Sequence, residues 1–164
     1  MFTIRKATFD DCHLISKMAE KVFPETYRDI LSPEQLTYMM NWMYSIHHIQ
    51  KQMEEGHTFF IAYKENEPCG YCSIQQEGED LFHLQKLYVL PSFQGLQCGI
   101  FLFNELIKYI KEIHPEPCSM ELNVNRHNKA VSFYERMGMR KLREGDFAIG
   151  DGYYMNDYIM GIEL

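Results

Sequence analysis

The stretch from Leu81 to Ile113 joins a strand, a glycine-bearing turn and a helix, with the sequence LFHLQKLYVLPSFQGLQCGIFLFNELIKYIKEI. Alternating residue types predict the strand, Pro91 ends it, and apolar residues at three-four spacing predict a helix after Gly99. The first turn of such a helix carries N–H groups without backbone partners and the positive end of the helix dipole, so it could hold a phosphate or pyrophosphate. By itself this signal is weak, because glycines at strand-to-helix turns are common for conformational reasons.

A second segment, Met120 to Met139, has a comparable layout of short strand, polar loop and short helix. Asn128 is a candidate N-cap and Gly138 a helix stop. Together the two segments resemble the GCN5-related N-acetyltransferase (GNAT) family. Its acetyl-CoA loop, Gln/Arg-x-x-Gly-x-Gly/Ala, corresponds here to Gln94, Gly95, Leu96, Gln97, Cys98 and Gly99, and its later Asn-x-x-Ala-x-x-x-Tyr motif corresponds to His127, Ala130 and Tyr134.

Two residues depart from the family pattern. Gln97 stands where the family usually has its first loop glycine, so the backbone there must reach the pyrophosphate without a positive φ or with strain. His127 takes the place of the usual Asn, with Asn128 beside it.

The resemblance implies acetyl-CoA as cosubstrate and an α+β fold. We expect a mixed, mostly antiparallel sheet of about seven strands, with about four helices packed on both faces. The central strand and the fifth strand are expected to splay and leave a slot for the pantetheine arm. The resemblance places the cofactor on the loop Gln94–Gly99 and on Leu87, Tyr88, Val89, Asn128, Lys129 and Tyr134.

If acetyl-CoA lies there, an amine attacks the thioester directly. An alkyl amine with a pKa near ~10.4 is only about 0.1% neutral at pH 7.4, which corresponds to roughly 4 kcal/mol. A proton acceptor is therefore required, and His83 on the central strand is preferred because Gln85 cannot accept a proton usefully. Glu121 and Glu79 are the alternatives, and His83 could instead be a purely structural, half-buried histidine.

Tyr134 occupies the position of the family's general acid. A phenol with a pKa near ~10 can protonate a thiolate whose conjugate acid is near ~8.5 at a cost of about 2 kcal/mol, and less if the helix start lowers the phenol's pKa. The alternative role is packing of the last helix onto the sheet. A backbone N–H near Tyr88 or Val89 is expected to stabilise the oxyanion.

The first two helices and their connection supply carboxylates and aromatic rings, which could bind a cationic chain by charge and cation–π contact. The substrate candidates among them are Glu25, Tyr27, Tyr38 and Trp42. The ETY…SPEQL pattern is similar to that of the bacterial spermidine/spermine N-acetyltransferases, which implies a polyamine or another small primary amine. A protein or peptide N-acetyltransferase with an open groove and a non-catalytic acyl-CoA-binding module remain the alternatives.

The whole chain of 164 residues, 46% of them hydrophobic, suits one domain spanning residues 1–164. It has no apolar run of the ~20 residues that a membrane span needs and no signal-peptide layout, so we expect a cytoplasmic protein. The net charge of −7 argues against nucleic acid and suits either a cationic substrate or simple solubility. A homodimer is expected from the family, with the apolar C-terminal strand 158–164 as the pairing edge.

The five cysteines form no disulfide framework, and we expect reduced thiols. Cys69 and Cys72 should present their sulfurs to alternate faces of a strand, which disfavours a redox module. One CxxC motif is only half a zinc site, so no metal is expected.

These residues must be positioned by the following elements. A strand over residues 2–7 leads to a helix that Pro24 ends after about Phe23, and Ser32-Pro33 opens a second helix running to about Glu55. Residues 57–63 and 69–76 predict a hairpin, and residues 139–143 with 153–163 a second one. In the central strand, we expect Phe82, Leu84, Lys86 and Tyr88 on one face and His83, Gln85, Leu87 and Val89 on the other.

Overall fold

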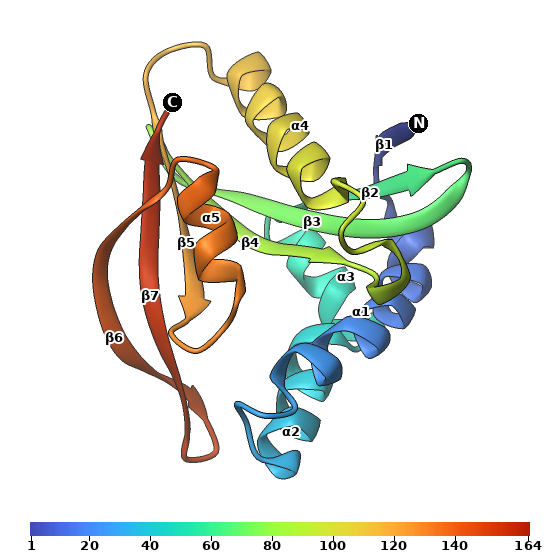
Figure 1. Ribbon diagram of the computed structural model, residues 1–164, viewed down its shortest axis with the longest axis vertical. Coiled ribbons are helices and arrows are strands. Elements are labelled where there is room, and N and C mark those ends of the chain that lie inside the picture. The colour runs from blue at the N-terminus through green and yellow to red at the C-terminus, as the bar shows by residue number, and fades with distance from the viewer.

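The computed structural model describes residues 1–164 and contains one seven-stranded sheet (Figure 1). Its strands lie in the order β1-β2-β3-β4-β5-β7-β6, and every neighbouring pair is antiparallel except β4 with β5. The mixed, mostly antiparallel α+β sheet that we expected is therefore confirmed. The strands are β1 Phe2–Lys6, β2 Thr58–Lys64, β3 Glu67–Gly78, β4 Leu81–Val89, β5 Ser119–Asn125, β6 Arg140–Gly150 and β7 Tyr153–Glu163.

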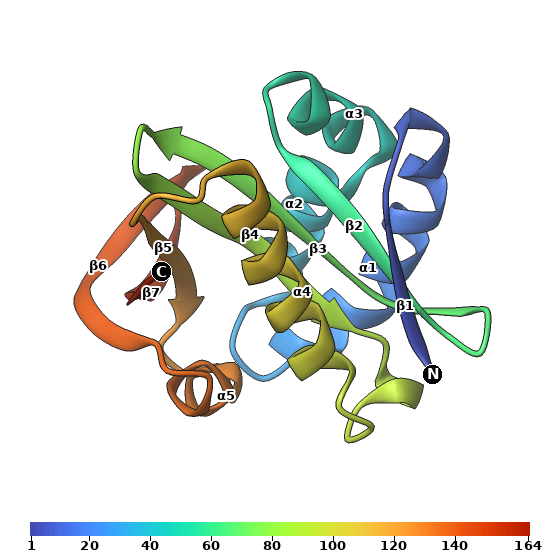
Figure 2. The ribbon, with the colours of Figure 1, turned by 90° about the horizontal axis from the view of Figure 1, so that it is seen from above.

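Five α-helices cover the two faces of the sheet, with α1, α2 and α3 on one side and α4 and α5 on the other (Figure 2). Each side has its own apolar core, and the larger one lies beneath α4 and α5. The helices are α1 Cys12–Tyr27, α2 Pro33–Tyr44, α3 Ile46–Glu54, α4 Cys98–Ile113 and α5 Ala130–Arg136, with short 3-10 turns at Phe9–Asp11 and Pro91–Phe93.

The prediction of about four helices was one too few, because the segment after Ser32 does not form a single helix. Ser45 is extended, with ψ of 151°, and its hydroxyl accepts a hydrogen bond from the His48 backbone N–H at 3.3 Å. A serine that caps the next helix in this way competes with continuation of the helix before it. The chain therefore turns between α2 and α3.

The prediction that Pro24 ends the first helix was also wrong, since α1 continues through it to Tyr27. Tyr27 is only 5% exposed and packs on Phe23 with ring centroids 4.6 Å apart. The Thr26 hydroxyl also donates to the Val22 carbonyl at 2.9 Å. These contacts offset the backbone hydrogen bond that a proline inside a helix removes, and they carry the last turn of α1 over the sheet.

A bulge in β4 reverses the expected alternation of its side chains. Ser73 of β3 pairs with Lys86 while the next residue, Ile74, pairs with Leu84, so Gln85 has no partner in the register. Phe82 and Leu84 pack in the core beneath α4, but so do Leu87 and Val89, whereas Tyr88 packs toward α1 and α2. The assignment of faces was therefore wrong beyond residue 84, because one extra residue in a strand inverts every side chain after it.

A similar irregularity in β3 places Cys69 and Cys72 in the same core rather than on alternate faces. Tyr63 pairs with Pro68 and Ala62 with Gly70, which leaves Cys69 outside the register. Its sulfur lies 3.2 Å from that of Cys98. All five cysteines are free and buried.

The C-terminal strand does not offer an edge to a second copy of the chain. β7 lies between β5 and β6, so the free edges of the sheet belong to β1 and β6. The expected pairing through residues 158–164 is therefore wrong. No helix has the length and apolar character needed to cross a membrane.

Candidate active site

The parallel pairing of β4 and β5 stops half-way along β4. Register pairs run from Leu81 with Ser119 to Leu84 with Leu122 and then cease. Beyond this point the two strands diverge (Figure 1), and a cavity of about 700 Å³ lies at the divergence. It is lined by residues 84–89 of β4, residues 122–124 of β5, the end of α1, the start of α4, and the loop before α5 together with α5 itself.

The start of α4 forms one end of this cavity. Gln94 and Gly99 line it, and the Gln94 side-chain amide donates to the Val89 carbonyl at 3.2 Å. The first helical bond of α4 runs from the Phe101 N–H to the Gln97 carbonyl. The three N–H groups before Phe101 therefore lack helical partners and, with the helix dipole, favour an anion.

Within the loop, the side chains of residues 95–98 do not line the cavity. Gly95 has a φ of +80° and Gln97 a φ of +70°, so Gln97 adopts the left-handed conformation of a loop glycine at a cost of about 1 kcal/mol. Leu96 is exposed, while Cys98 is buried against Cys69. Of the six loop residues expected to bind the cofactor, the cavity is therefore lined by Gln94 and Gly99.

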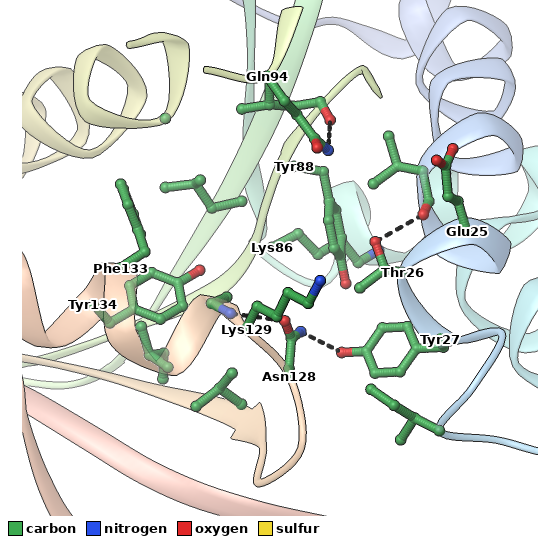
Figure 3. A pocket seen from close by; sticks show the side chains of 18 of the residues that line it. Glu25, Thr26, Tyr27, Lys86, Tyr88, Gln94, Asn128, Lys129, Phe133 and Tyr134 are labelled. Carbon is green, nitrogen blue, oxygen red and sulfur yellow. Dashed lines mark hydrogen bonds between the residues drawn. The ribbon is translucent and has the colours of Figure 1, made fainter. Parts of the chain in front are cut away.

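The wall opposite α4 comes from the loop before α5. The Asn128 side-chain carbonyl accepts from the Ala130 N–H at 2.9 Å, and its amide nitrogen donates to the Tyr27 hydroxyl at 3.3 Å (Figure 3). Asn128 thus orders the start of α5 and ties it to α1. Lys129 and Arg136 also line the cavity and supply positive charge.

Tyr134 lies on this wall, 7% exposed, with its hydroxyl directed into the cavity (Figure 3). Burial raises its pKa well above the ordinary value, and the neighbouring Tyr27 and Cys72 add to the effect. The helix start does not lower the pKa as we expected, because desolvation outweighs the dipole. The phenol is therefore protonated at neutral pH, and donation of its proton to a thiolate costs more than the about 2 kcal/mol expected for an ordinary phenol.

The structure does not bring the expected proton acceptors to the cavity. His83 lies outside it, with Nδ1 3.8 Å from a carboxylate oxygen of Glu77 and Nε2 buried without a partner. Glu121 accepts a hydrogen bond from Arg143 at 2.8 Å and also lies outside. Glu79 is in the β3–β4 turn, at the end of β4 remote from the cavity.

The expected substrate residues divide into two pairs. Glu25 and Tyr27 line the cavity. Tyr38 instead donates its hydroxyl proton to the Ile149 carbonyl at 2.8 Å, and Trp42, which is 41% exposed, packs beside the Tyr38 ring. These two residues connect α2 to the β6–β7 hairpin and do not reach the cavity.

Lys86 also lines the cavity, and its sequence position gave no signal of this, because β4 holds the polar residues His83 and Gln85 as well. It is 4% exposed, and its ammonium donates to the Gln52 side-chain carbonyl at 2.6 Å and to the Met43 carbonyl at 3.3 Å. The Tyr44 ring lies 4.6 Å from it. Burial lowers the pKa of Lys86 from 10.5 to about 7.

The cavity suits a long, partly anionic thioester. Beyond Leu84 the edge of β4 that faces β5 has no strand partner, so its backbone groups can bind an amide-bearing arm. A Cβ on Gly99 would lie 3.4 Å from the Phe133 ring, at van der Waals contact, so the start of α4 packs directly against α5 at this wall of the cavity. The α4 terminus, Lys129 and Arg136 can hold phosphates.

Known proteins share both the sequence pattern and this geometry. The family described as "Acetyltransferase (GNAT) domain" matches residues 27–156. A relative from Saccharolobus solfataricus named N-alpha-acetyltransferase is 23% identical over 172 residues, covering 94% of this chain and 90% of the relative.

Two solved structures show the same fold. The PaiA N-acetyltransferase from Thermoplasma acidophilum in complex with coenzyme A has a TM-score of 0.82 at 22% identity and covers 100% of this chain and 99% of its own. The ribosomal-protein-S18-alanine N-acetyltransferase from Escherichia coli has a TM-score of 0.74 at 16% identity, and the match covers 99% of this chain and 94% of the Escherichia coli chain. With the family match spanning most of its length, the chain belongs to the GNAT acetyltransferases and is an N-acetyltransferase that uses acetyl-CoA.

Proposed function

We propose that this enzyme acetylates a small primary amine, with Tyr134 as the proton donor to the leaving thiolate. The observation that carries the proposal is the buried, protonated Tyr134 hydroxyl, directed into the cavity where β4 and β5 separate. Acetyl-CoA supplies an activated acyl group as a thioester. Donation of the phenolic proton to sulfur then avoids release of a free thiolate.

The cofactor is expected along the wall between α4 and α5. The N–H groups at the start of α4, within Gln94–Gly99, and the side chains of Lys129 and Arg136 would hold its phosphates. The backbone of residues 87–89 would bind the arm, and an N–H group near Tyr88 or Val89 would stabilise the oxyanion. Asn128 would order this wall through its bonds to Ala130 and Tyr27.

The acceptor is expected on the side of α1, where Glu25 and Asp29 line the cavity and favour a cation. This side is closed at α2, because the Gln35 amide donates to the Tyr154 carbonyl at 2.9 Å and Tyr38 donates to Ile149. An extended polypeptide would have to separate α2 from the β6–β7 hairpin to lie there. The closed side therefore favours a small amine such as a polyamine.

A protein N-terminus is the second candidate. The names of the two relatives, N-alpha-acetyltransferase and ribosomal-protein-S18-alanine N-acetyltransferase, favour it. Such a substrate also presents a primary amine, so Tyr134 would have the same role.

A thiol-release assay with acetyl-CoA separates these candidates. Spermidine, spermine, a peptide with a free N-terminus and a lysine peptide with a blocked N-terminus are compared at pH 7 to 9. We expect saturable turnover of the polyamines and little of the peptides. Turnover of the free-N-terminus peptide alone would replace the small amine by a protein, and coenzyme A binding without thiol release from any acceptor would support a non-catalytic binding module.

The homodimer and the cytoplasmic location stay predictions. With β7 inside the sheet, a dimer would use another surface. Sedimentation equilibrium of the purified chain gives its mass directly, and a mass of one chain would exclude the dimer.

A further inference from the structure

The proposed reaction needs an acceptor for the amine proton, and neither His83 nor Glu121 reaches the cavity. Asp157, in the middle of β7, is a buried carboxylate. It is 6% exposed, and its Oδ1 has no hydrogen-bond partner. Its Oδ2 accepts only a long hydrogen bond, at 3.4 Å, from the side-chain amide of Asn123.

No cation in the protein is paired with this carboxylate. The charge of Arg126 lowers the pKa of Asp157, but the Arg126 guanidinium is bound to Asp146 and lies 3.9 Å from Glu144. A buried carboxylate without a counter-ion is costly, so it tends to take up a proton or to meet a cation from outside. Consistent with this, burial raises the pKa of Asp157, while Asn123 and Arg126 act in the opposite direction.

Like His83 and Glu121, Asp157 does not itself line the cavity, but a side chain that does line it, Asn123, is hydrogen-bonded to its carboxylate. Asn123, which bonds to it from β5, lines the cavity, and so does Tyr27 from α1. Burial raises the pKa of Tyr27 to about 12, the hydrogen bond from Asn128 acts in the opposite direction, and the charge of Asp157 adds to the rise. On β6, the register partner of Asp157 is Gly145, which brings no side-chain charge to it.

We propose that Asp157 forms the binding site for the acceptor ammonium and takes its proton, through the Tyr27 hydroxyl or a water molecule beside Asn123. This inference rests on the proposed amine acetylation. The first N–H bond of the ammonium breaks, and its proton passes to Asp157 and then to solvent. The freed lone pair forms the bond from nitrogen to the acetyl carbon, which gives a tetrahedral oxyanion. Its collapse breaks the C–S bond while Tyr134 gives its proton to sulfur, and the second proton lost from nitrogen restores the Tyr134 hydroxyl.

The test compares Asp157→Asn with Asp151→Asn, a change of the same kind in the exposed turn between β6 and β7. Two acceptors are used: the most active alkyl amine of the panel, and methoxyamine, which is neutral at pH 7. For the alkyl amine, Asp157→Asn should lower kcat/KM at pH 7 by about 100-fold, and the loss should shrink as the pH rises toward the pKa of the amine. For methoxyamine, the rate should stay within about threefold of wild type, since no proton has to be removed before attack.

Equal losses for the two acceptors would overturn the proposal in favour of a structural role, and so would an unchanged rate for the alkyl amine. Asp151→Asn should match wild type throughout. A wild-type protein that turns over no amine would refute the proposed function itself, whereas an active wild type with an unaffected Asp157→Asn refutes the role of Asp157 alone.

Folding is checked in the same samples. Because Asp157→Asn removes a buried charge without a counter-ion, it should unfold at the same temperature as wild type or higher. If that variant does not fold, Tyr27→Phe removes the hydroxyl of the proposed proton path and should show the same selective loss for the alkyl amine. An equal loss for both acceptors in Tyr27→Phe would then overturn the proposal.

Discussion

Replacing Lys86 by Met should change how stability depends on pH. Lys86 is 4% exposed and is surrounded by the Gln52 and Met43 oxygens and by the Tyr44 and Phe59 rings. Methionine has a similar length and no charge, so Lys86→Met removes the titrating group and little of the packing.

The expected magnitude follows from the pKa of Lys86, which burial lowers from 10.5 to about 7. Between these two values the unfolded chain binds a proton that the folded chain has released, so the free energy of unfolding rises with pH. From pH 7 to pH 9 this single group should add about 2 kcal/mol to wild type. His57 and His83 have pKa values lowered by burial, below 6.5, and do not titrate in this window.

The measurement is urea unfolding of wild type and Lys86→Met at pH 7, 8 and 9, with the exposed Lys108→Met as control. The difference between Lys86→Met and wild type should shift by about 2 kcal/mol in favour of wild type from pH 7 to pH 9. The control should follow wild type. Parallel pH profiles for wild type and Lys86→Met would mean that the surrounding oxygens and rings keep the ammonium charged, and the reasoning from burial would be refuted.

Five further substitutions test the placement of the site, the packing of β3 against β4 and the strain in the loop before α4. His83→Gln and Glu121→Gln should each keep kcat within about threefold of wild type in the thiol-release assay, because both side chains lie outside the cavity. A 100-fold loss in either variant would mean that the substituted residue is the proton acceptor. Gly70→Ala should lower the free energy of unfolding by on the order of 2 kcal/mol or more in urea melts, since the new Cβ would lie 2.5 Å from the Tyr88 carbonyl oxygen. Gly78→Ala is the matched control: its Cβ would lie 3.5 Å from the nearest atom, and it should cost under about 1 kcal/mol. Gln97→Gly should raise stability by up to about 1 kcal/mol by relieving the left-handed φ of +70°; a large loss would show that the Gln97 side chain holds the loop.

Local signals predicted much of the fold. The Ser32-Pro33 start, the Gly56 stop and the short turn between β2 and β3 depend on contacts between near neighbours in the chain, and the structure has each of them. The helix after Gly99 was also visible, because its apolar residues repeat at helical spacing over four turns. Such features are encoded within a few residues and need no knowledge of tertiary contacts.

Errors occurred where tertiary packing overrode a local rule. Pro24 is retained inside α1 because Tyr27 is buried beyond it, and the bulge at Gln85 depends on pairing with β3. A bulge leaves no mark in the residue types of its own strand, so the faces of residues 87–89 were inverted. His83 was expected at the site because strict alternation placed it on the same face as Leu87 and Val89, and the bulge at Gln85 separates it from them.

The site itself was predicted in part. Tyr134, Asn128 and Gly99 were found from motif spacing, and the cavity contains all three. Lys86, Asn123 and Asp157 were missed, since each is one of several polar residues in its strand and its importance depends on which strands and helices lie beside it. The order β5-β7-β6 places Asp157 next to Asn123, and that order cannot be deduced from local pattern.

The most direct test of the account is the kcat of Tyr134→Phe, measured by thiol release together with the affinity for acetyl-CoA. Phenylalanine keeps the buried ring and removes the hydroxyl, which has no hydrogen-bond partner within the protein, so the fold should be preserved. The account predicts a 10- to 1000-fold lower kcat, on the order of general-acid contributions, with acetyl-CoA affinity within a few-fold of wild type. An unchanged kcat, or a loss of affinity as large as the loss of kcat, would contradict the role of Tyr134 as proton donor.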